Sequence, residues 1–249
     1  MTKLNLKFRD YIYLAIILFF AGCMQEPKSD NAIISEALPI EEKDPGIVYA
    51  IDTSYSLITW VGTKPTGRHN GLIKIKSGSI TVIEEDTKRL IKTFNISNAR
   101  ILIDMESVKV LDLMDNPLQL EKLENHLRSE DFFDTKTFAE AEFELISFEP
   151  IEKDTVVREN NKYTIIDPTH TMSGNLTIKG KTLNVRFPVK ADYRNLKLEV
   201  SAKFNLDRTE WDITYKDEND PVARATDGFI HNIVNVGFDI IARPETSTE

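Results

Sequence analysis

The feature that most constrains this chain is a two-residue alternation of apolar and polar side chains that returns in one segment after another. It is clearest between residues 183 and 206, where the apolar members are Leu183, Val185, Phe187, Val189, Leu196, Leu198, Val200, Ala202, Phe204 and Leu206. Successive side chains of a strand point to opposite faces, so this alternation predicts long strands with one apolar face. Such strands can surround either a filled core or a cavity, and periodicity alone does not separate the two.

Short β-branched or aromatic runs, divided by Asp, Ser, Asn and Gly, predict the remaining strands. The predicted strands are 48–51, 56–62, 72–75, 79–83, 92–96, 98–103, 141–148, 162–166, 169–179, 183–191, 196–206 and 229–241. Gly180 can adopt a positive φ and therefore predicts a tight hairpin between the runs on either side of it. Many antiparallel strands with a single helix favour a barrel or a sandwich over a βαβ arrangement.

One amphipathic helix interrupts the series of strands. Asn116 can cap its free amides, and Pro117 is tolerated at its first position. His126, near the helix end, is expected to interact with the free carbonyls there. Two sets of apolar residues, at helical spacing and in the turn that follows, should pack the helix onto the strands: Leu120, Leu123 and Leu127, then Phe132, Phe133 and Phe138.

The amino-terminal segment has the organisation of a targeting signal. A basic start is followed by an apolar run over residues 11–20, which is too short to span a bilayer. The segment ends on Phe20-Ala21-Gly22-Cys23, which resembles the lipobox of bacterial lipoproteins, although Phe20 stands where Leu is commoner. We therefore expect residues 1–22 to be a lipoprotein signal peptide and Cys23 to carry the lipid. The expected location is the bacterial cell envelope, on the outer membrane facing the periplasm.

Cys23 is the single cysteine of the chain, so an internal disulfide and a thiolate metal site are excluded. Residues 23–46 mix charged residues and prolines without clear periodicity, which predicts a flexible lipid-anchored tether. Ile33, Ile34, Leu38 and Ile40 leave open the alternative that this segment docks on the domain. We assign the folded domain to residues 47–243 and a carboxy-terminal tail to residues 244–249.

The charge balance restricts the partners. Charged residues make up 29% of the chain and the formal net charge is −9, which argues against a nucleic-acid partner and against electrostatic binding to anionic lipid. Attachment to a membrane must then be covalent, through Cys23. The sequence leaves open whether the domain pairs with a second copy as a homodimer.

Nothing in the sequence indicates catalysis. The four histidines are far apart, and the chain has no H-E-x-x-H, no G-x-S-x-G and no phosphate-binding glycine loop. We therefore expect no catalytic residues, no metal and no cofactor. Two irregular stretches remain: residues 149–161 are expected to be an exposed loop without a function, and residues 214–228 are a candidate mobile flap.

Four stretches, in order along the chain, resemble the YceI-like domain family, and the resemblance covers nearly all of residues 49–241. They are Tyr49-Ala50-Ile51-Asp52 with Ser56-Leu57-Ile58-Thr59-Trp60, His126-Leu127-Arg128-Ser129-Glu130-Asp131-Phe132-Phe133, Ser173-Gly174-Asn175-Leu176-Thr177-Ile178-Lys179-Gly180, and Phe204-Asn205-Leu206-Asp207-Arg208-Thr209-Glu210-Trp211. In the first stretch Tyr55 stands where a His is usual. The resemblance implies an all-β fold, a lipocalin-like antiparallel β-barrel of about eight strands with one flanking short α-helix.

The resemblance also implies that the barrel interior holds a long-chain lipid of the isoprenoid or fatty amide type, which the protein binds, stores or shuttles without converting it. Two alternatives stay open. One is an anchored scaffold with a filled core that binds another envelope protein. The other is an enzyme whose site is formed only in space. A lipophilic molecule that purifies with the domain would favour the carrier, and turnover of a substrate would favour the enzyme.

The candidate lining residues are those on the apolar faces of alternating runs: Trp60, Phe143, Leu176, Ile178, Val185, Phe187, Val200, Phe204, Val236 and Phe238. A register error of one residue would turn any of them outward. Arg208 and Trp211 are expected near the barrel mouth. For Arg208 we favour a structural ion pair, with Asp207 or Asp131, over binding to a lipid head group.

Overall fold

The computed structural model of the 249-residue chain describes residues 26–41, 44–85, 93–152, 157–226 and 228–245. The predicted signal peptide, Cys23 and residues 246–249 lie outside the described residues. Among the residues that the structure does describe, no helix has the length and apolar content needed to cross a membrane.

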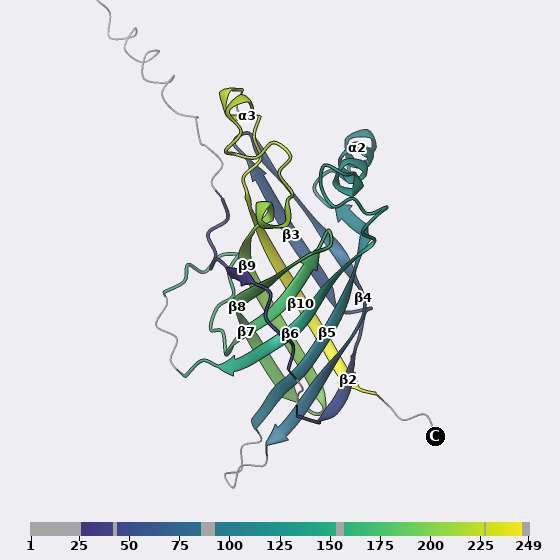
Figure 1. Cartoon of the computed structure of the whole chain (residues 1–249), viewed down its shortest axis with the longest axis vertical. Coiled ribbons are helices and arrows are strands. Elements are labelled where there is room, and N and C mark those ends of the chain that lie inside the picture. Colours follow the sequence, from purple (N-terminus) through teal and green to yellow (C-terminus); the bar gives the residue numbers. More distant parts are fainter. Residues whose placement is uncertain (1–25, 42–43, 86–92, 153–156, 227, 246–249) are drawn as a thin grey trace, which may run out of the picture.

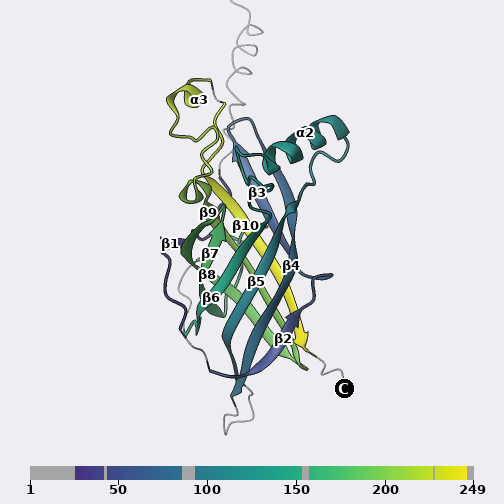
Figure 2. The ribbon, with the colours of Figure 1, turned by 45° about the vertical axis from the view of Figure 1, so that its right-hand side comes forward.

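The domain is a closed antiparallel β-barrel of eight strands, β3 to β10, with two additional strands (Figures 1 and 2). Each barrel strand pairs with the next along the chain, and β10 returns to pair with β3. The strands are β1 (Ile33–Glu36), β2 (Ile47–Ile51), β3 (Leu57–Lys64), β4 (Gly67–Glu85), β5 (Thr93–Val110), β6 (Glu140–Pro150), β7 (His170–Ile178), β8 (Lys181–Arg194), β9 (Lys197–Asp207) and β10 (Ile233–Pro244). The predicted barrel is confirmed.

Strands β4 and β5 correct the sequence prediction, which divided each of them into two. Their pairing shifts register between Leu72 and Lys74, between Ile75 and Ser77, and between Thr81 and Val82. A bulge inserts an extra residue and reverses the alternation beyond it. As a result Ile75 and Ile80 are both buried and both line the interior, although they are an odd number of residues apart.

The predicted helix is α2 (Pro117–Arg128), and the Asn116 side chain caps it by accepting a hydrogen bond from the Gln119 amide, 3.3 Å away. The prediction for His126 was wrong. Its Nε2 lies 2.9 Å from Asp131 Oδ2, and its ring stands edge-on to Phe132 and Tyr215. The turn after the helix bends back and offers a carboxylate, which binds the imidazole in place of the helix carbonyls.

The predicted hairpin joins β7 to β8 through a two-residue turn. Lys179 and Gly180 have φ values of 48° and 74°, as a type I′ turn requires, and Ile178 pairs with Lys181 across it. The Phe138 ring packs closely here, because a Cβ built on Gly180 would approach it to 2.9 Å. The turn is therefore held against the exit of α2, as the apolar character of Phe138 predicted.

Residues 26–40, which we call the strap, lie on the outside of the barrel. Strand β1 within it pairs with β8, and the Ala32 amide and the Asp30 carbonyl bond to the backbone of Asn205 on β9. The strap thus fills the gap between the first half of β8 and β9, because β8 pairs with β9 only from Lys190 onward. The expectation of a flexible tether does not hold for these residues, and the docking alternative does.

Buried asparagines on the outer face of the barrel bind the strap. Asn175 donates to the Leu38 carbonyl at 2.7 Å and accepts from the Leu38 amide at 3.0 Å. Asn205 donates to the Pro27 carbonyl at 2.9 Å. Both side chains would face water on a bare barrel, but each residue is only 6% exposed. Their hydrogen bonds to backbone groups compensate for the burial of polar groups.

Two loops depart from prediction around the strap. Residues 162–166 form turns instead of a strand, and the Thr164 hydroxyl donates to the Lys28 carbonyl at 2.8 Å. In the 149–161 loop, expected to have no function, Arg158 pairs with Asp30 at 2.6 Å. Residues 158–164 therefore make polar contacts to the strap where the sequence analysis expected an exposed loop and a strand. The partners are far apart in sequence, so only the folded chain brings them together.

Candidate ligand-binding site

An apolar cavity of about 360 Å³ occupies one part of the barrel interior. All eight barrel strands contribute to its wall, and α2 with its exit turn closes one side through Leu123, Leu127, Phe132 and Phe133. The volume is within the range of small-molecule pockets, which are mostly apolar with a few polar groups. The wall has this character: its polar side chains belong mainly to the end of the β3–β4 hairpin and to the turn after β9.

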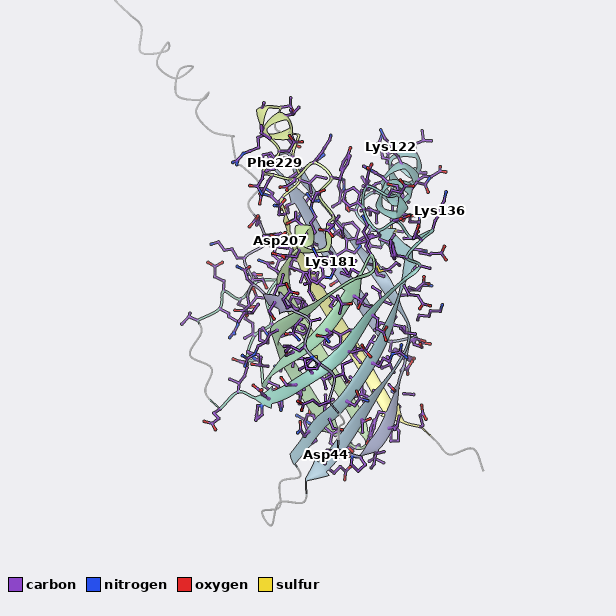
Figure 3. The ribbon with its side chains drawn as sticks, viewed as in Figure 1. Asp44, Lys122, Lys136, Lys181, Asp207 and Phe229 are labelled. Atoms are coloured by element: carbon purple, nitrogen blue, oxygen red, sulfur yellow. The ribbon has the colours of Figure 1, made fainter. Side chains whose placement is uncertain are left out.

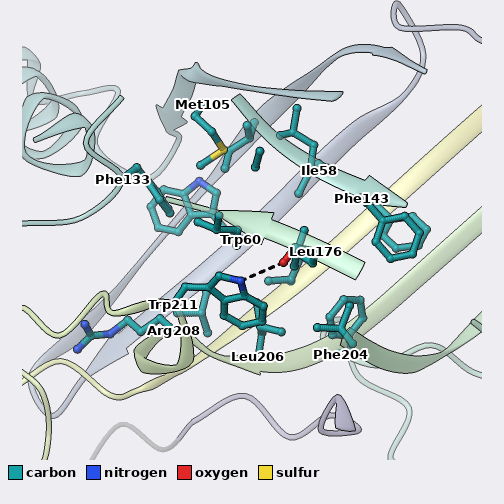
Figure 4. Close-up of a pocket in the computed structure, with 18 of the residues that line it drawn as sticks. Ile58, Trp60, Met105, Phe133, Phe143, Leu176, Phe204, Leu206, Arg208 and Trp211 are labelled. Carbon is teal, nitrogen blue, oxygen red and sulfur yellow. Dashed lines mark hydrogen bonds between the residues drawn. The ribbon is translucent and has the colours of Figure 1, made fainter. Parts of the chain in front are cut away.

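Every one of the ten predicted lining residues contributes to this wall, and none is turned to the outer face: Trp60, Phe143, Leu176, Ile178, Val185, Phe187, Val200, Phe204, Val236 and Phe238. Figure 4 labels Trp60, Phe143, Leu176 and Phe204 among them. The alternation places them correctly because it continues without a bulge through the strands that carry most of them. That a lipid binds to these residues stays a prediction.

Four phenylalanines from separate strands form one side of the cavity. The rings of Phe187 and Phe204 stack at a centroid distance of 4.1 Å, with Phe238 edge-on to Phe187 at 5.9 Å and Phe143 tilted against it at 6.2 Å. Gly174 on β7 makes room for this packing, because a Cβ there would lie 2.2 Å from the Phe143 ring. The rings present flat apolar faces suited to alkyl or isoprenyl chains.

Trp60 supplies a polar group that is not satisfied by the protein. Its Nε1 is buried and, among the described residues, meets no hydrogen-bond partner. The indole lies against β4, where a Cβ on Gly71 would approach its ring to 2.6 Å. A buried donor without a partner costs about 1–3 kcal/mol, so an acceptor brought by a ligand or a water would recover stability here.

Arg208 lies at the start of η1 (Arg208–Trp211), the short 3₁₀ turn after β9, and is only 6% exposed. Its guanidinium donates to four backbone carbonyls, those of Ile213, Tyr215, Ile230 and His231. The expected ion pair with Asp207 or Asp131 is therefore wrong, although the structural role is right. Four of its five N–H groups are used, so little remains for a head group.

Trp211, the second residue expected at the mouth, is fully buried. Its Nε1 donates to the Leu176 carbonyl at 3.1 Å, as the dashed line in Figure 4 shows. The indole closes the cavity wall between β7 and η1 and is not accessible from outside. Together, Arg208 and Trp211 fold the chain after β9 over the cavity, and they support the end of the barrel as structural residues.

The structure adds wall residues that the sequence analysis missed. They come mainly from β4 and β5: Ile73, Ile75, Ile80, Ile96, Ile101, Ile103 and Met105. Their signal was present as alternating isoleucines, but the bulges shift the alternation and hide which face each residue shares.

The cavity reaches the outside at the end of the barrel that carries α2 and η1. Wall residues at this end are partly exposed, among them Trp60, Phe133 and Ile230. The opposite end is filled by Tyr49, Phe94, Phe148, His170 and Tyr193, none of which borders the cavity. We call the first the open end and the second the closed end. Figure 3 shows Lys122 and Phe229 toward the open end and Asp44 at the closed end.

One group of side chains near the open end has the composition of a metal site: Glu26, Glu218 and His231. The His231 Nδ1 lies 3.0 Å from Glu218 Oε2 and 3.6 Å from Glu26 Oε1. Burial, and next the neighbouring Glu218 carboxylate, raise the pKa of Glu26. These contacts join the first described residue of the strap to the barrel, and we assign the group to that role.

One of the solved structures that are similar to this chain supports the fold. A polyisoprenoid binding domain from Saccharophagus degradans, described as implicated in plant cell wall breakdown, aligns with a TM-score of 0.50 at 13% identity, covering 80% of this chain and 99% of that chain. BcnA of Burkholderia cenocepacia aligns with a TM-score of 0.47 at 18% identity, covering 77% of this chain and 98% of that chain. A Campylobacter jejuni YCEI protein aligns with a TM-score of 0.46 at 15% identity, covering 69% of this chain and 84% of that chain.

No curated protein matches the sequence. The YceI-like domain, in contrast, matches it over residues 49–242, which is most of the chain and includes β3 to β9 and all but the last two residues of β10. The four stretches that resembled this family all fall within the matched range. The chain belongs to the YceI-like family.

Proposed function

We propose that this protein is a lipid-anchored protein of the bacterial envelope that binds, stores or shuttles a long-chain lipid inside its barrel without converting it. The observation that carries the proposal is the cavity, to whose wall all eight barrel strands contribute apolar side chains. Each CH₂ group moved from water into such a cavity contributes about 0.8 kcal/mol, so an alkyl or isoprenyl chain can bind without a charged partner.

The free donor on Trp60 refines the class of ligand. A pure hydrocarbon would leave Nε1 unsatisfied, whereas a chain that carries a carbonyl, hydroxyl or amide oxygen can accept its hydrogen bond. The guanidinium of Arg208 is occupied by carbonyls, so an anionic head group finds no free cation from this residue. Lys64 and Arg68, at the end of the β3–β4 hairpin, are other cations that line the cavity. We expect an amphiphile of the isoprenoid or fatty amide type.

Residues 214–228 are proposed to gate the cavity. In the structure the Tyr215 ring packs on His126 and Phe132, with centroid distances of 4.6 and 5.5 Å, and so joins this loop to the exit of α2 across the open end. Release of a bound chain requires these aromatic contacts to separate. A Tyr215→Ala variant should accelerate ligand release, and stopped-flow displacement of a fluorescent fatty amide measures the rate.

Native mass spectrometry of the detergent-free protein, followed by organic extraction, tests the proposal. A discrete hydrophobic compound at near-stoichiometric amount is the expected result and would identify the ligand. Phe187→Asp and Phe204→Asp should abolish its retention, because each places a carboxylate in the apolar wall. A ligand-free mass after incubation with isoprenoids and fatty amides would contradict the proposal and favour an anchored scaffold that binds another envelope protein.

A further inference from the structure

The docking of the strap begins at its first described residue. Glu26 contacts His231, the Pro27 carbonyl accepts from the buried Asn205, and the Lys28 carbonyl accepts from Thr164. The Asp30–Arg158 ion pair follows, with side chains that are 22% and 10% exposed. From Glu26 onward, therefore, backbone and side-chain contacts attach the chain to the barrel.

This docking determines how far the barrel can lie from an anchor on Cys23. Glu26 lies three positions after Cys23, and a fully extended chain reaches roughly 11 Å over three residue steps. If residues 23–46 were a free tether, the chain would be able to reach roughly 80 Å before β2. The strap therefore converts a long tether into a short one.

The short tether ends beside the opening of the cavity. His231, the partner of Glu26, donates its backbone amide to the Thr63 carbonyl at 3.0 Å, and Thr63 and Ile230 both belong to the cavity wall. The closed end is much farther away, since β10, which begins two residues after His231, has 12 residues and extends about 40 Å from Ile233 to Pro244. An anchor at Cys23 can hold the open end at a membrane surface but cannot bring the closed end there.

Exposed apolar side chains do not decide the orientation by themselves, because both ends carry them. At the open end, Leu118 on α2 is 79% exposed and Val222 on α3 (Pro221–Ala225) is 75% exposed. At the closed end, Ile47 and Leu196 are 48% and 55% exposed. What distinguishes the two ends is the path of the strap. Figures 1 and 2 show α2 and α3 together at one end, with the C-terminus at the other.

We infer that the docked strap holds the open end of the barrel against the bilayer that anchors Cys23, with α2 and α3 contacting the lipid surface. This inference rests on the proposed function, because it requires the lipid on Cys23. The occupant of the open end is then the bilayer itself. A long-chain lipid passes between bilayer and cavity without its chain crossing water, which avoids an exposure cost of about 0.8 kcal/mol per CH₂.

Photocrosslinking tests the orientation. The full chain, expressed in a bacterium that processes lipoproteins, is purified and reconstituted into vesicles of phosphatidylethanolamine and phosphatidylglycerol. A photoreactive amino acid replaces Leu118 or Val222 at the open end, and Ile47 or Leu196 at the closed end as exposed controls. We expect at least tenfold more phospholipid adduct, measured by peptide mass, at the first two positions. Equal adduct at both ends, or more at Ile47 and Leu196, would overturn the inference.

A tether variant tests the role of the strap. A flexible linker of 20 Gly and Ser residues between Gln25 and Glu26 leaves the docking contacts in place and extends the reach by about 25 Å on average. The preference for the open end should fall severalfold. The same linker inserted after Glu245 serves as the control and should leave the preference unchanged. A preference that survives the first insertion would overturn the role of the short tether.

Two further measurements separate this inference from the proposed function. The intact mass of the purified protein reports lipid on Cys23, and an unmodified cysteine would overturn the inference whatever the barrel binds. Organic extraction of the same samples reports a ligand in the cavity. Open-end crosslinking without any extractable ligand would contradict the carrier function and leave the orientation supported.

Discussion

The two ends of this barrel are built from the same strands and the same alternation, yet one end is filled and the other is hollow. At the closed end, Phe148 stacks on His170 at 4.1 Å, and the hydroxyls of Tyr49 and Tyr193 lie 2.6 Å apart. At the open end, Trp60 and the phenylalanines lie around the cavity and leave its centre empty. Both ends therefore share the two-residue alternation of apolar and polar side chains. They differ in whether the inward side chains reach far enough to fill the barrel.

Truncation of an aromatic ring should give the largest difference between the two ends. Phe148→Ala at the closed end should cost about 3–5 kcal/mol of unfolding free energy, because it leaves a cavity in a packed region. Phe238→Ala at the open end should cost less than half of that, since its ring already borders empty space. Urea denaturation measures both. Equal losses would show that the open end is as densely packed as the closed end.

Enlargement of a valine gives the complementary comparison. Val189→Trp, at a fully buried closed-end position, should destabilise by about 1–3 kcal/mol through overpacking. Val236→Trp should be accommodated in the cavity, with little loss of stability, and should reduce lipid retention at least tenfold. Thermal unfolding and organic extraction are the measurements. Full retention in Val236→Trp would remove this position from the binding site.

Removal of the unsatisfied donor should weaken the binding of ligands that carry an acceptor. Trp60→Phe keeps an apolar ring in the wall but cannot donate a hydrogen bond, so affinity for a ligand with an oxygen acceptor should fall roughly 3–10-fold. Affinity for a simple hydrocarbon chain should not change, which provides the control. Titration of an alkanol and an alkane of equal length separates the two cases, and an equal change for both would indicate a shape effect.

Acid pH should weaken the closed end slightly. Burial lowers the pKa of His170, so the folded state favours the neutral imidazole. The stability from this group is complete above the ordinary histidine pKa of about 6.5 and decreases as the pH falls through that value toward the lower folded one. Melting temperature should fall between pH 7 and pH 5, and less steeply in His170→Phe. Identical slopes in the two proteins would contradict this assignment.

Several parts of the fold and site could be predicted from local pattern. Gly180 predicted its turn because a positive φ is a property of a single residue, and Asn116 with Pro117 predicted the start of the helix for a similar reason. The ten wall residues were predicted because alternation assigns a face within an unbroken strand. Where bulges shift the alternation, in β4 and β5, the same reasoning divided strands and missed their wall residues.

The sequence by itself determined most of the strands, the helix, the apolar faces of the unbroken strands and the family, because these depend on residues close along the chain or on motifs. Only the tertiary structure decided which end is hollow, where the strap docks and which groups satisfy Arg208. Each of these depends on partners far apart in sequence, such as Pro27 with Asn205, and Arg208 with the His231 carbonyl. Alternation specifies the face of a side chain. The cavity depends on how far side chains from all the strands reach into the barrel, and the docking of the strap depends on partners that only the folded barrel brings together.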